Sequence, residues 1–164
     1  MDVFDAITSW RSVRRFTAKP VSDDFIKRIL EAGRWAQSGL NNQPWRFSVI
    51  KEKKLKDAVA ANTKYGFVVK EAPACIAVFL NTQDMYDRTK DVQAVGACIQ
   101  NMLRAAHDLG LGAVWLGEIL THRVQVEKML GVPEYCELMA LIAVGWPAEN
   151  PPKAERKDLS ELVL

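Results

Sequence analysis

"DVQAVGACIQNMLRAAHDLG", Asp91 to Gly110, is the longest regular pattern in the chain. Its apolar and small residues recur at intervals of three and four, which is typical of one face of a helix. They are Val92, Val95, Gly96, Ile99, Met102, Leu103 and Ala106. Gly110 follows at a position where glycine commonly ends a helix. We therefore expect a long helix over residues 91–109, with neighbours packed closely against its small residues.

Shorter patterns on both sides of this segment predict further strands and helices. Two continuous apolar runs and two shorter ones are typical of strands. The strands are expected at residues 46–50, 74–80, 112–117 and 138–146. The other helices are expected at residues 2–10, 22–37, 51–61 and 122–130. Asp2, Ser22 and Thr121 are the expected caps, and Gly131 the expected end of the last helix. The order is irregular, without βαβ alternation, so the fold class is α+β.

The composition is that of an ordinary globular protein. The chain has 164 residues, 49% apolar and 26% charged, so we expect a single domain over residues 1–164. A net charge of +2 argues against a nucleic-acid binder, which needs a broad basic face. Three widely spaced cysteines favour a reducing, cytoplasmic setting over a disulfide framework. The apolar run at residues 138–144 is too short for a membrane span.

The C-terminal segment, residues 147–164, differs from the rest of the chain. It is polar and interrupted by proline, yet it ends in Leu162, Val163 and Leu164. A free tail would stay polar to its end. We therefore expect this tail to dock, either on its own subunit or on a partner.

The turn "SWRSVRRF", Ser9 to Phe16, concentrates positive charge in a nearly neutral chain. Arg11, Arg14 and Arg15 beside serine hydroxyls can donate forked hydrogen bonds to a phosphate. Arg156 and Lys157 in the tail are further candidates for such a site. The alternative is a solvated basic turn without a ligand.

The loop "AQSGLNNQPWRF", residues 36–47, combines hydroxyl and amide groups ahead of a strand. Such side chains offer hydrogen-bond donors and acceptors together, which is the pattern presented by the polar edge of a flavin or a nucleobase. A plain connecting loop is the alternative.

Other chemistries lack their motifs. The glycines of "LGLGAVWLGE", residues 109–118, follow a helix and enter a strand, the reverse of the dinucleotide-binding order. His107 and His122 have no neighbours at metal-ligand spacing, so no metal is expected. There is no Walker A motif, no GxSxG and no evident acid–base pair. An enzyme of this sequence would therefore rely on a cofactor for its chemistry.

Together these motifs resemble the FMN-dependent nitroreductase family, with this chain as a minimal member. The matching segments are "RSVR" (11–14), "SGLNNQPW" (38–45), "ACIQNMLRAAHDLGLGAVWLGE" (97–118) and "VGWPAENPPKAER" (144–156). The resemblance runs from Phe4 to Leu162. It implies a mixed β-sheet around a long central helix. It also implies a homodimer that exchanges its C-terminal tails and holds two FMN sites at its interface.

The resemblance implies a set of cofactor-binding residues. They are Arg11, Ser12, Arg14, Gln37, Ser38, Gly39, Asn41, Gly117, Glu118 and Arg156. Arg11, Ser12 and Arg156 would hold the FMN phosphate, and Arg14 would reach the pyrimidine and ribityl region. Gln37, Ser38, Gly39 and Asn41 would contact the flavin from the other subunit. The backbone N–H of Gly117 would point near flavin N5, with Glu118 beside it.

Three departures from the family pattern bear on these roles. Trp10 stands where many members have a basic residue, and Gln37 stands where the usual residue is proline. Only ten residues, Asn81 to Lys90, separate a strand from the long helix, where larger members insert helices that cover the flavin. The lysine that some members place by the pyrimidine has two candidates here, Lys64 and Lys70.

The implied activity is an FMN-dependent oxidoreductase with NAD(P)H as the donor. Hydride would pass through flavin N5 to a small acceptor, such as a nitroaromatic or a quinone, in a ping-pong scheme. No catalytic side chain is expected. Two alternatives stay open: a flavin-binding protein without NAD(P)H turnover, and a specialised relative that fragments flavin or removes halogen.

Overall fold

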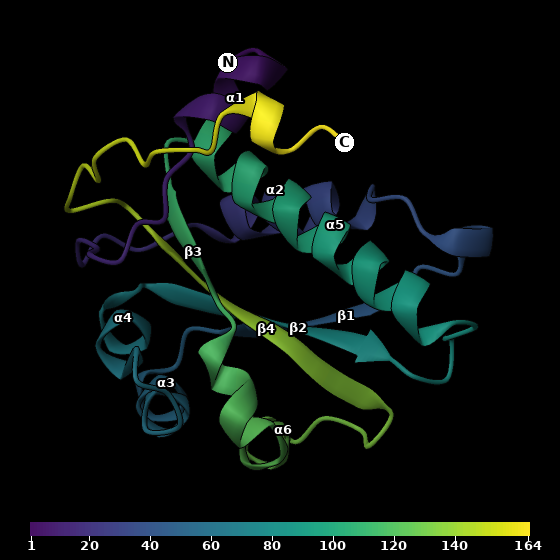
Figure 1. Cartoon of the computed structure of the whole chain (residues 1–164). Helices are drawn as coiled ribbons and strands as arrows, with labels where there is room; N and C mark the ends of the chain where they lie inside the picture. The colour runs from purple at the N-terminus through teal and green to yellow at the C-terminus, as the bar shows by residue number, and fades with distance from the viewer.

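The computed structural model describes all residues from 1 to 164, and a four-stranded sheet lies at its centre (Figure 1). The strands are β1 (Trp45–Ile50), β2 (Ala74–Asn81), β3 (Gly112–Leu116) and β4 (Cys136–Gly145). Their spatial order is β1-β2-β4-β3, and every neighbouring pair is antiparallel. The resemblance implied a mixed sheet. Within this chain, parallel pairing is limited to one isolated bridge between Ser12 and Ala113.

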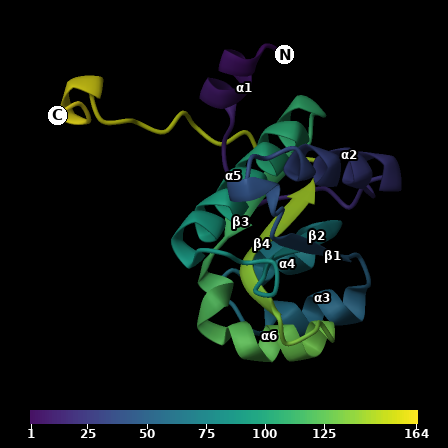
Figure 2. The ribbon, with the colours of Figure 1, turned by 90° about the vertical axis from the view of Figure 1, so that its right-hand side faces the viewer.

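Helices cover both faces of the sheet (Figures 1 and 2). On one side lie α2 (Asp23–Arg34) and α5 (Arg88–Asp108). On the other lie α3 (Lys53–Ala60), α4 (Gly66–Glu71) and α6 (Arg123–Leu130). Helix α1 (Val3–Ser9) projects beyond the sheet and buries no residue. The predicted α+β fold with a long central helix is confirmed.

Strand β2 shows why its sequence is apolar without interruption. Ile76, Val78 and Leu80 belong to the hydrophobic core under α2 and α5. The alternate residues Ala77 and Phe79 belong to a second core against the opposite helices. Because both faces are covered, all eight residues of β2 are buried.

The long helix α5 begins at Arg88, three residues before the expected start, because Asp87 caps it by accepting a hydrogen bond from the N–H of Lys90. It ends at Asp108, and Gly110 takes a positive φ of 76° as expected of a helix terminator. The close packing comes from the neighbouring helix: a Cβ on Gly33 would lie 2.8 Å from Met102 Cγ.

Two local predictions need correction. Thr121 does not cap α6, because a 3₁₀ turn, η2 (Glu118–His122), precedes the helix and His122 occupies the cap position. Helix α4 was not predicted, because six residues are too few to show a helical period. The predicted caps Asp2 and Ser22 are confirmed, as is the end of α6 at Gly131.

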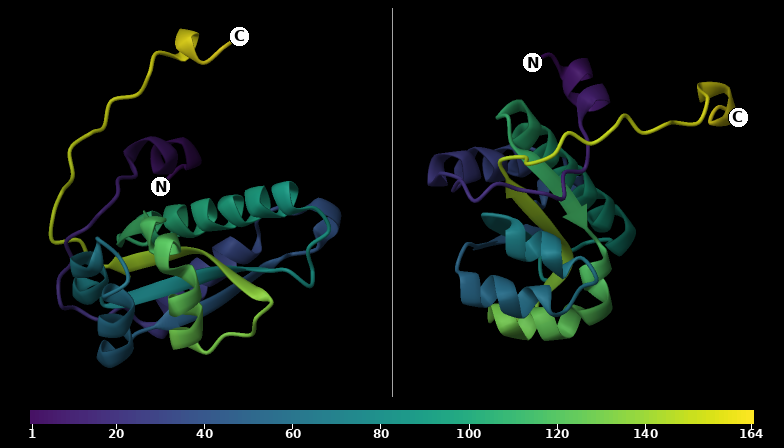
Figure 3. Two further views of the ribbon diagram at one scale, coloured as in Figure 1. Left: turned by 60° about the horizontal axis from the view of Figure 1, so that its bottom comes forward. Right: turned by 90° about the vertical axis from the view of Figure 1, so that its left-hand side faces the viewer.

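The tail leaves the body of the subunit after β4 and extends into solvent (Figure 3). Its last turn, η3 (Leu159–Glu161), is capped by Asp158. Leu159, Leu162, Val163 and Leu164 are exposed. No helix of the chain combines the length and the apolar character that crossing a membrane requires.

Candidate functional site

The arginine-rich turn is fixed against the end of the sheet. The N–H of Val13 donates to the carbonyl of Ala113 in β3 over 3.2 Å, and Phe16 forms a bridge with Pro147 after β4. Gly112 lets the turn come close, since a Cβ there would lie 2.7 Å from Val13 Cβ. The turn therefore has a defined place relative to the sheet although its arginines are at the surface.

The arginines of this turn differ in their partners. Arg15 pairs with Glu71 at 3.3 Å, and the same carboxylate accepts the N–H of Phe16. Arg11 donates to the backbone carbonyls of Thr8 and Trp10. Neither Arg11 nor Arg14 forms an ion pair with a carboxylate, so Arg15 has a structural role while the other two remain available to an anion.

The tail completes a cationic pocket beside this turn. Glu149 ties the tail to the turn, because its Oε1 accepts the N–H of Arg14 at 2.6 Å and that of Arg15 at 3.2 Å. The pocket that results has a volume of about 320 Å³. Its lining consists of Trp10, Arg11, Ser12, Arg14, Pro151, Pro152, Ala154 and Arg156.

The electrostatics of this cationic pocket favour an anion. Arg156, like Arg11 and Arg14, has no carboxylate partner. Burial and the charge of Arg156 lower the pKa of the nearby Arg104. Burial lowers the pKa of His107 too, helped by the charges of Arg104 and Arg11. Guanidinium forks and a serine hydroxyl are a donor set that fits a phosphate. The structure thus brings together four of the predicted residues, Arg11, Ser12, Arg14 and Arg156.

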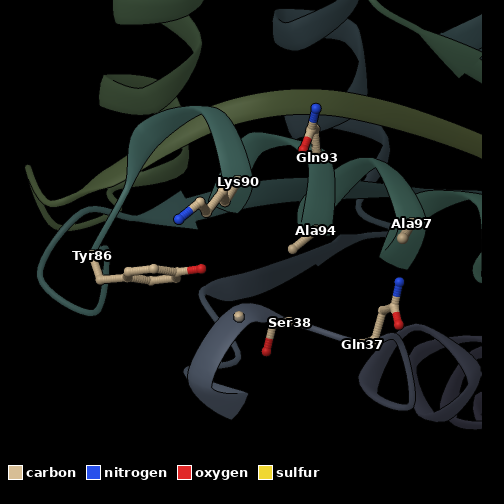
Figure 4. Close-up of a pocket in the computed structure, with 8 residues that line it drawn as sticks. Gln37, Ser38, Tyr86, Lys90, Gln93, Ala94 and Ala97 are labelled. Carbon is tan, nitrogen blue, oxygen red and sulfur yellow. The ribbon is translucent and has the colours of Figure 1, made fainter.

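A second cavity, of about 370 Å³, lies between the 36–44 loop and the start of α5 (Figure 4). The residues that line it are Gln37, Ser38, Gly39, Tyr86, Lys90, Gln93, Ala94 and Ala97. Three predicted residues are therefore on one wall of this cavity. Asn41, the fourth of that group, follows in the same loop but does not line the cavity.

The 36–44 loop has an uncommon backbone. Leu40, Asn41 and Gln43 take positive φ values of 55°, 55° and 48°. Such conformations are costly for residues other than glycine and are concentrated at functional sites. Local hydrogen bonds hold them, since Ser38 Oγ accepts the N–H of Gln43 at 3.0 Å. This backbone supports a binding role for the loop over a plain connection.

Gly117 and Glu118 lie where β3 ends and η2 begins. The carboxylate of Glu118 accepts hydrogen bonds from Thr63 Oγ1 at 2.6 Å and from the N–H of Lys64 at 2.9 Å. The bond from Thr63, followed by that from Lys64, lowers the pKa of Glu118. This arrangement places Lys64 beside the Gly117 turn. Lys70 lies instead on α4, near Asp57. The pKa of Asp57 is lowered mainly by its hydrogen bond from Lys53, and the charge of Lys70 adds to this effect.

In one subunit the predicted residues form three separate groups: the cationic pocket, the cavity of the 36–44 loop, and the Gly117 turn. Several residues in these places were missed in the sequence, among them Glu149, Tyr86, Lys90 and Asp91. Glu149 carries no local signal, because only the folded chain brings it to the turn.

A model of the family described as "Nitroreductase family" matches residues 7–64 and 55–146. The chain belongs to the nitroreductase family. This confirms the resemblance drawn from the motifs. A nitroreductase relative from Methanothermobacter thermautotrophicus, described as an NADH dehydrogenase/NAD(P)H nitroreductase, is 35% identical over 153 residues, covering 92% of this chain and 80% of its own.

A second nitroreductase relative, the NADPH-flavin oxidoreductase of Vibrio harveyi, is 27% identical over 162 residues, 92% of this chain and 68% of its own. Among solved structures, a Desulfovibrio desulfuricans protein described as a nitroreductase in complex with FMN is 48% identical. It superposes with a TM-score of 0.96 and covers 100% of this chain and 96% of its own. The nitroreductase fold is thus matched over the full chain, tail included.

Proposed function

We propose that this protein holds FMN at its subunit interface and uses it to pass a hydride from NAD(P)H to a small acceptor, such as a nitroaromatic or a quinone. The observation that carries the proposal is the cationic pocket, where Arg11, Arg14 and Arg156 surround Ser12 without carboxylate partners. Its donors fit the terminal phosphate of FMN.

The relatives support the cofactor and the kind of enzyme. FMN is bound in the Desulfovibrio structure, and the Vibrio relative is named as an NADPH-flavin oxidoreductase. The predicted class, an FMN-dependent NAD(P)H oxidoreductase, is confirmed at this level. When bound, FMN supplies the hydride chemistry, so the protein's part is to bind, orient and shield.

Each group of residues then has a task. Arg11, Ser12 and Arg156 bind the phosphate, while Arg14 provides positive charge towards the ribityl and pyrimidine region. Lys64 rather than Lys70 is the cation beside the ring, because its backbone is hydrogen-bonded to Glu118 next to Gly117. A cation there stabilises negative charge on the pyrimidine.

The second subunit supplies the remaining contacts. Gln37, Ser38, Gly39 and Asn41 lie apart from the cationic pocket of their own chain, as residues that serve the partner's flavin would. Two exposed apolar surfaces support a dimer: Val3, Phe4 and Ile7 on α1, and Leu162 to Leu164 in the tail.

The test is the visible spectrum of the purified protein, before and after NADH or NADPH is added under nitrogen. We expect flavin absorption that bleaches with one of the two and returns when a quinone is added. If neither nucleotide bleaches the flavin, the protein binds flavin without turning over NAD(P)H. A protein that stays colourless after incubation with FMN would refute the proposal.

A further inference from the structure

The cavity beside the 36–44 loop has a wall that the proposed function does not use. Tyr86, from the short loop that joins β2 to α5, lies across from Ser38 and Gly39 (Figure 4). A Cβ on Gly39 would lie 1.8 Å from Tyr86 Oη. The phenol ring therefore occupies space that exists only because residue 39 is glycine.

Lys90 adds a positive charge to the same wall. Its Nζ lies 5.2 Å from the centre of the Tyr86 ring, within the range of a cation–π contact. Both Lys90 and Tyr86 line the cavity, and Lys90 forms no ion pair with a carboxylate. An aromatic face next to a free ammonium suits a flat ring that carries an anionic group.

Asp91 holds this wall in place. Its side chain is fully buried and forms no ion pair, although Lys90 lies near enough for its charge to act on it. One oxygen accepts from Asn42 Nδ2 at 2.8 Å, and the other accepts the N–H groups of Tyr86 at 2.9 Å and Asp87 at 3.1 Å. Burial alone would raise the pKa of Asp91, but these hydrogen bonds, together with the charge of Lys90, outweigh it and the pKa lies below its usual value. One carboxylate thus joins both walls of the cavity, through Asn42 and through Tyr86.

The first half of the β2–α5 loop has further anchors, one of which shares Asn42 with Asp91, since Asn42 Nδ2 also donates to the carbonyl of Asp84 at 3.0 Å. Asp84 Oδ2 accepts from Arg46 at 2.6 Å and from Asn81 Nδ2 at 2.6 Å. These bonds hold the loop before Tyr86 and leave the backbone at Tyr86 dependent on Asp91. Removing the carboxylate therefore leaves the backbone N–H groups of Tyr86 and Asp87 without their acceptor.

We propose that Tyr86 and Lys90 select the acceptor, favouring a flat aromatic ring with a carboxylate or similar anion, and that Asp91 is the positioning residue of this wall. This inference rests on the proposed function, because it assigns the substrate class of the same site. Tyr86 offers the ring face, Lys90 pairs with the anion, and Asp91 acts only through Tyr86.

The first experiment compares 4-nitrobenzoate with its neutral counterpart 4-nitrobenzamide. We expect Lys90→Gln to lower the ratio of their kcat/KM values by about five-fold, the upper range for an exposed ion pair. The matched control is Lys54→Gln, an exposed lysine on α3 without an ion pair, which should leave the ratio unchanged. Titration of 4-nitrobenzoate into the oxidised FMN-loaded protein, without NAD(P)H, should show the same loss of affinity. An unchanged ratio and affinity in Lys90→Gln would overturn the assignment.

The second experiment tests whether Asp91 acts through Tyr86. Tyr86→Leu and Asp91→Asn should each raise KM about ten-fold for both acceptors, from the loss of one aromatic contact, with a smaller change in kcat. The double variant should show no further rise. Additive effects would mean that Asp91 has only a general structural role, and would overturn its part of the proposal. Should Asp91→Asn fail to fold, the variants at the two exposed residues still decide the acceptor assignment.

A rescue experiment does not depend on flavin or on turnover. In Asp91→Asn the new amide N–H₂ faces a donor, either Asn42 Nδ2 or the backbone N–H groups, and Asn42 can offer its unpartnered Oδ1 instead only by giving up its bond to the carbonyl of Asp84. Adding Asn42→Asp restores an acceptor opposite it. We expect fast amide hydrogen exchange at Tyr86 and Asp87 in Asp91→Asn, and protection regained in the double variant. Protected amides in Asp91→Asn would refute the positioning role, whereas a protein that fails to bleach with NAD(P)H would refute the proposed function only.

Discussion

Gly112→Ala is expected to damage the fold and the cofactor site together. A Cβ at this position would lie within 2.7–2.9 Å of three side-chain atoms of Val13, distances that real Cβ atoms essentially never show. Val13 is buried and cannot turn away, so the arginine turn must shift by about 1 Å to restore normal contact. That shift strains the 3.2 Å hydrogen bond from Val13 to Ala113.

The magnitude follows from these two effects. Overpacking costs about 1–3 kcal/mol, and the weakened backbone hydrogen bond adds about 1 kcal/mol. A loss of about 2–4 kcal/mol should lower the melting temperature of the FMN-free protein by roughly 5–12 °C. Arg11 and Ser12 move with Val13, so one charge-assisted bond to the phosphate should weaken and the Kd for FMN should rise about ten-fold or more.

The assay pairs thermal unfolding of the FMN-free protein with an FMN fluorescence titration. Gly96→Ala is the matched control, because a Cβ there meets only Trp115 at 3.9 Å and the position lies within α5. It should stabilise the protein by about 1 kcal/mol through helix propensity. If Gly112→Ala melts like the wild type and keeps its FMN affinity, the turn is not fixed by β3 and the reasoning is wrong.

Three further predictions concern charge and the tail. Arg11→Ala combined with Arg156→Ala should strip FMN from a protein that still folds, and a double variant that purifies fully yellow would contradict the phosphate assignment. Deletion of residues 148–164 should weaken the dimer and the flavin site together in sedimentation and absorbance measurements; an unchanged yellow dimer would refute tail exchange. Glu137 accepts a bidentate pair from Arg88, which lowers its pKa below the usual 4.5. Its stabilisation, about 1–2 kcal/mol, is therefore present above pH 4.5 and lost as the pH falls through the folded pKa. Glu137→Gln should lower the melting temperature at pH 7 and by progressively less as the pH falls below 4.5, and a loss that stays constant with pH would exclude the ion pair as the cause.

Sequence patterns predicted the elements whose burial is regular. The apolar run of β2 reads as a strand covered on both faces, and the structure places its alternate residues in two separate cores. Helix α5 was predicted apart from its first turn, since Arg88 to Lys90 are polar and only the Asp87 cap marks the start. The error at Thr121 has a similar origin, because a 3₁₀ turn has no periodicity that distinguishes it from the start of a helix.

The site was predictable where its residues cluster in sequence. The arginine turn and the 36–44 loop each carry a local signal, and the structure makes each the wall of a pocket. Asp91 carries a misleading local signal, because an acid in the first turn of a helix is usually a solvated charge near the helix dipole. Only its burial, with hydrogen bonds from Asn42 in the distant 36–44 loop and from Tyr86 just before α5, distinguishes it from a surface charge.

The distribution of carboxylates explains how a nearly neutral chain keeps a cationic pocket. Two acids come close to the arginine turn, and neither neutralises the arginines of the pocket. Glu71 pairs with Arg15, which does not line the cationic pocket. Glu149 is held by the backbone N–H groups of Arg14 and Arg15, so it fixes the tail without pairing with a guanidinium. Because Glu149 is held by the backbone rather than by a side chain, it joins the turn to the tail and leaves Arg11, Arg14 and Arg156 without a carboxylate partner in the pocket.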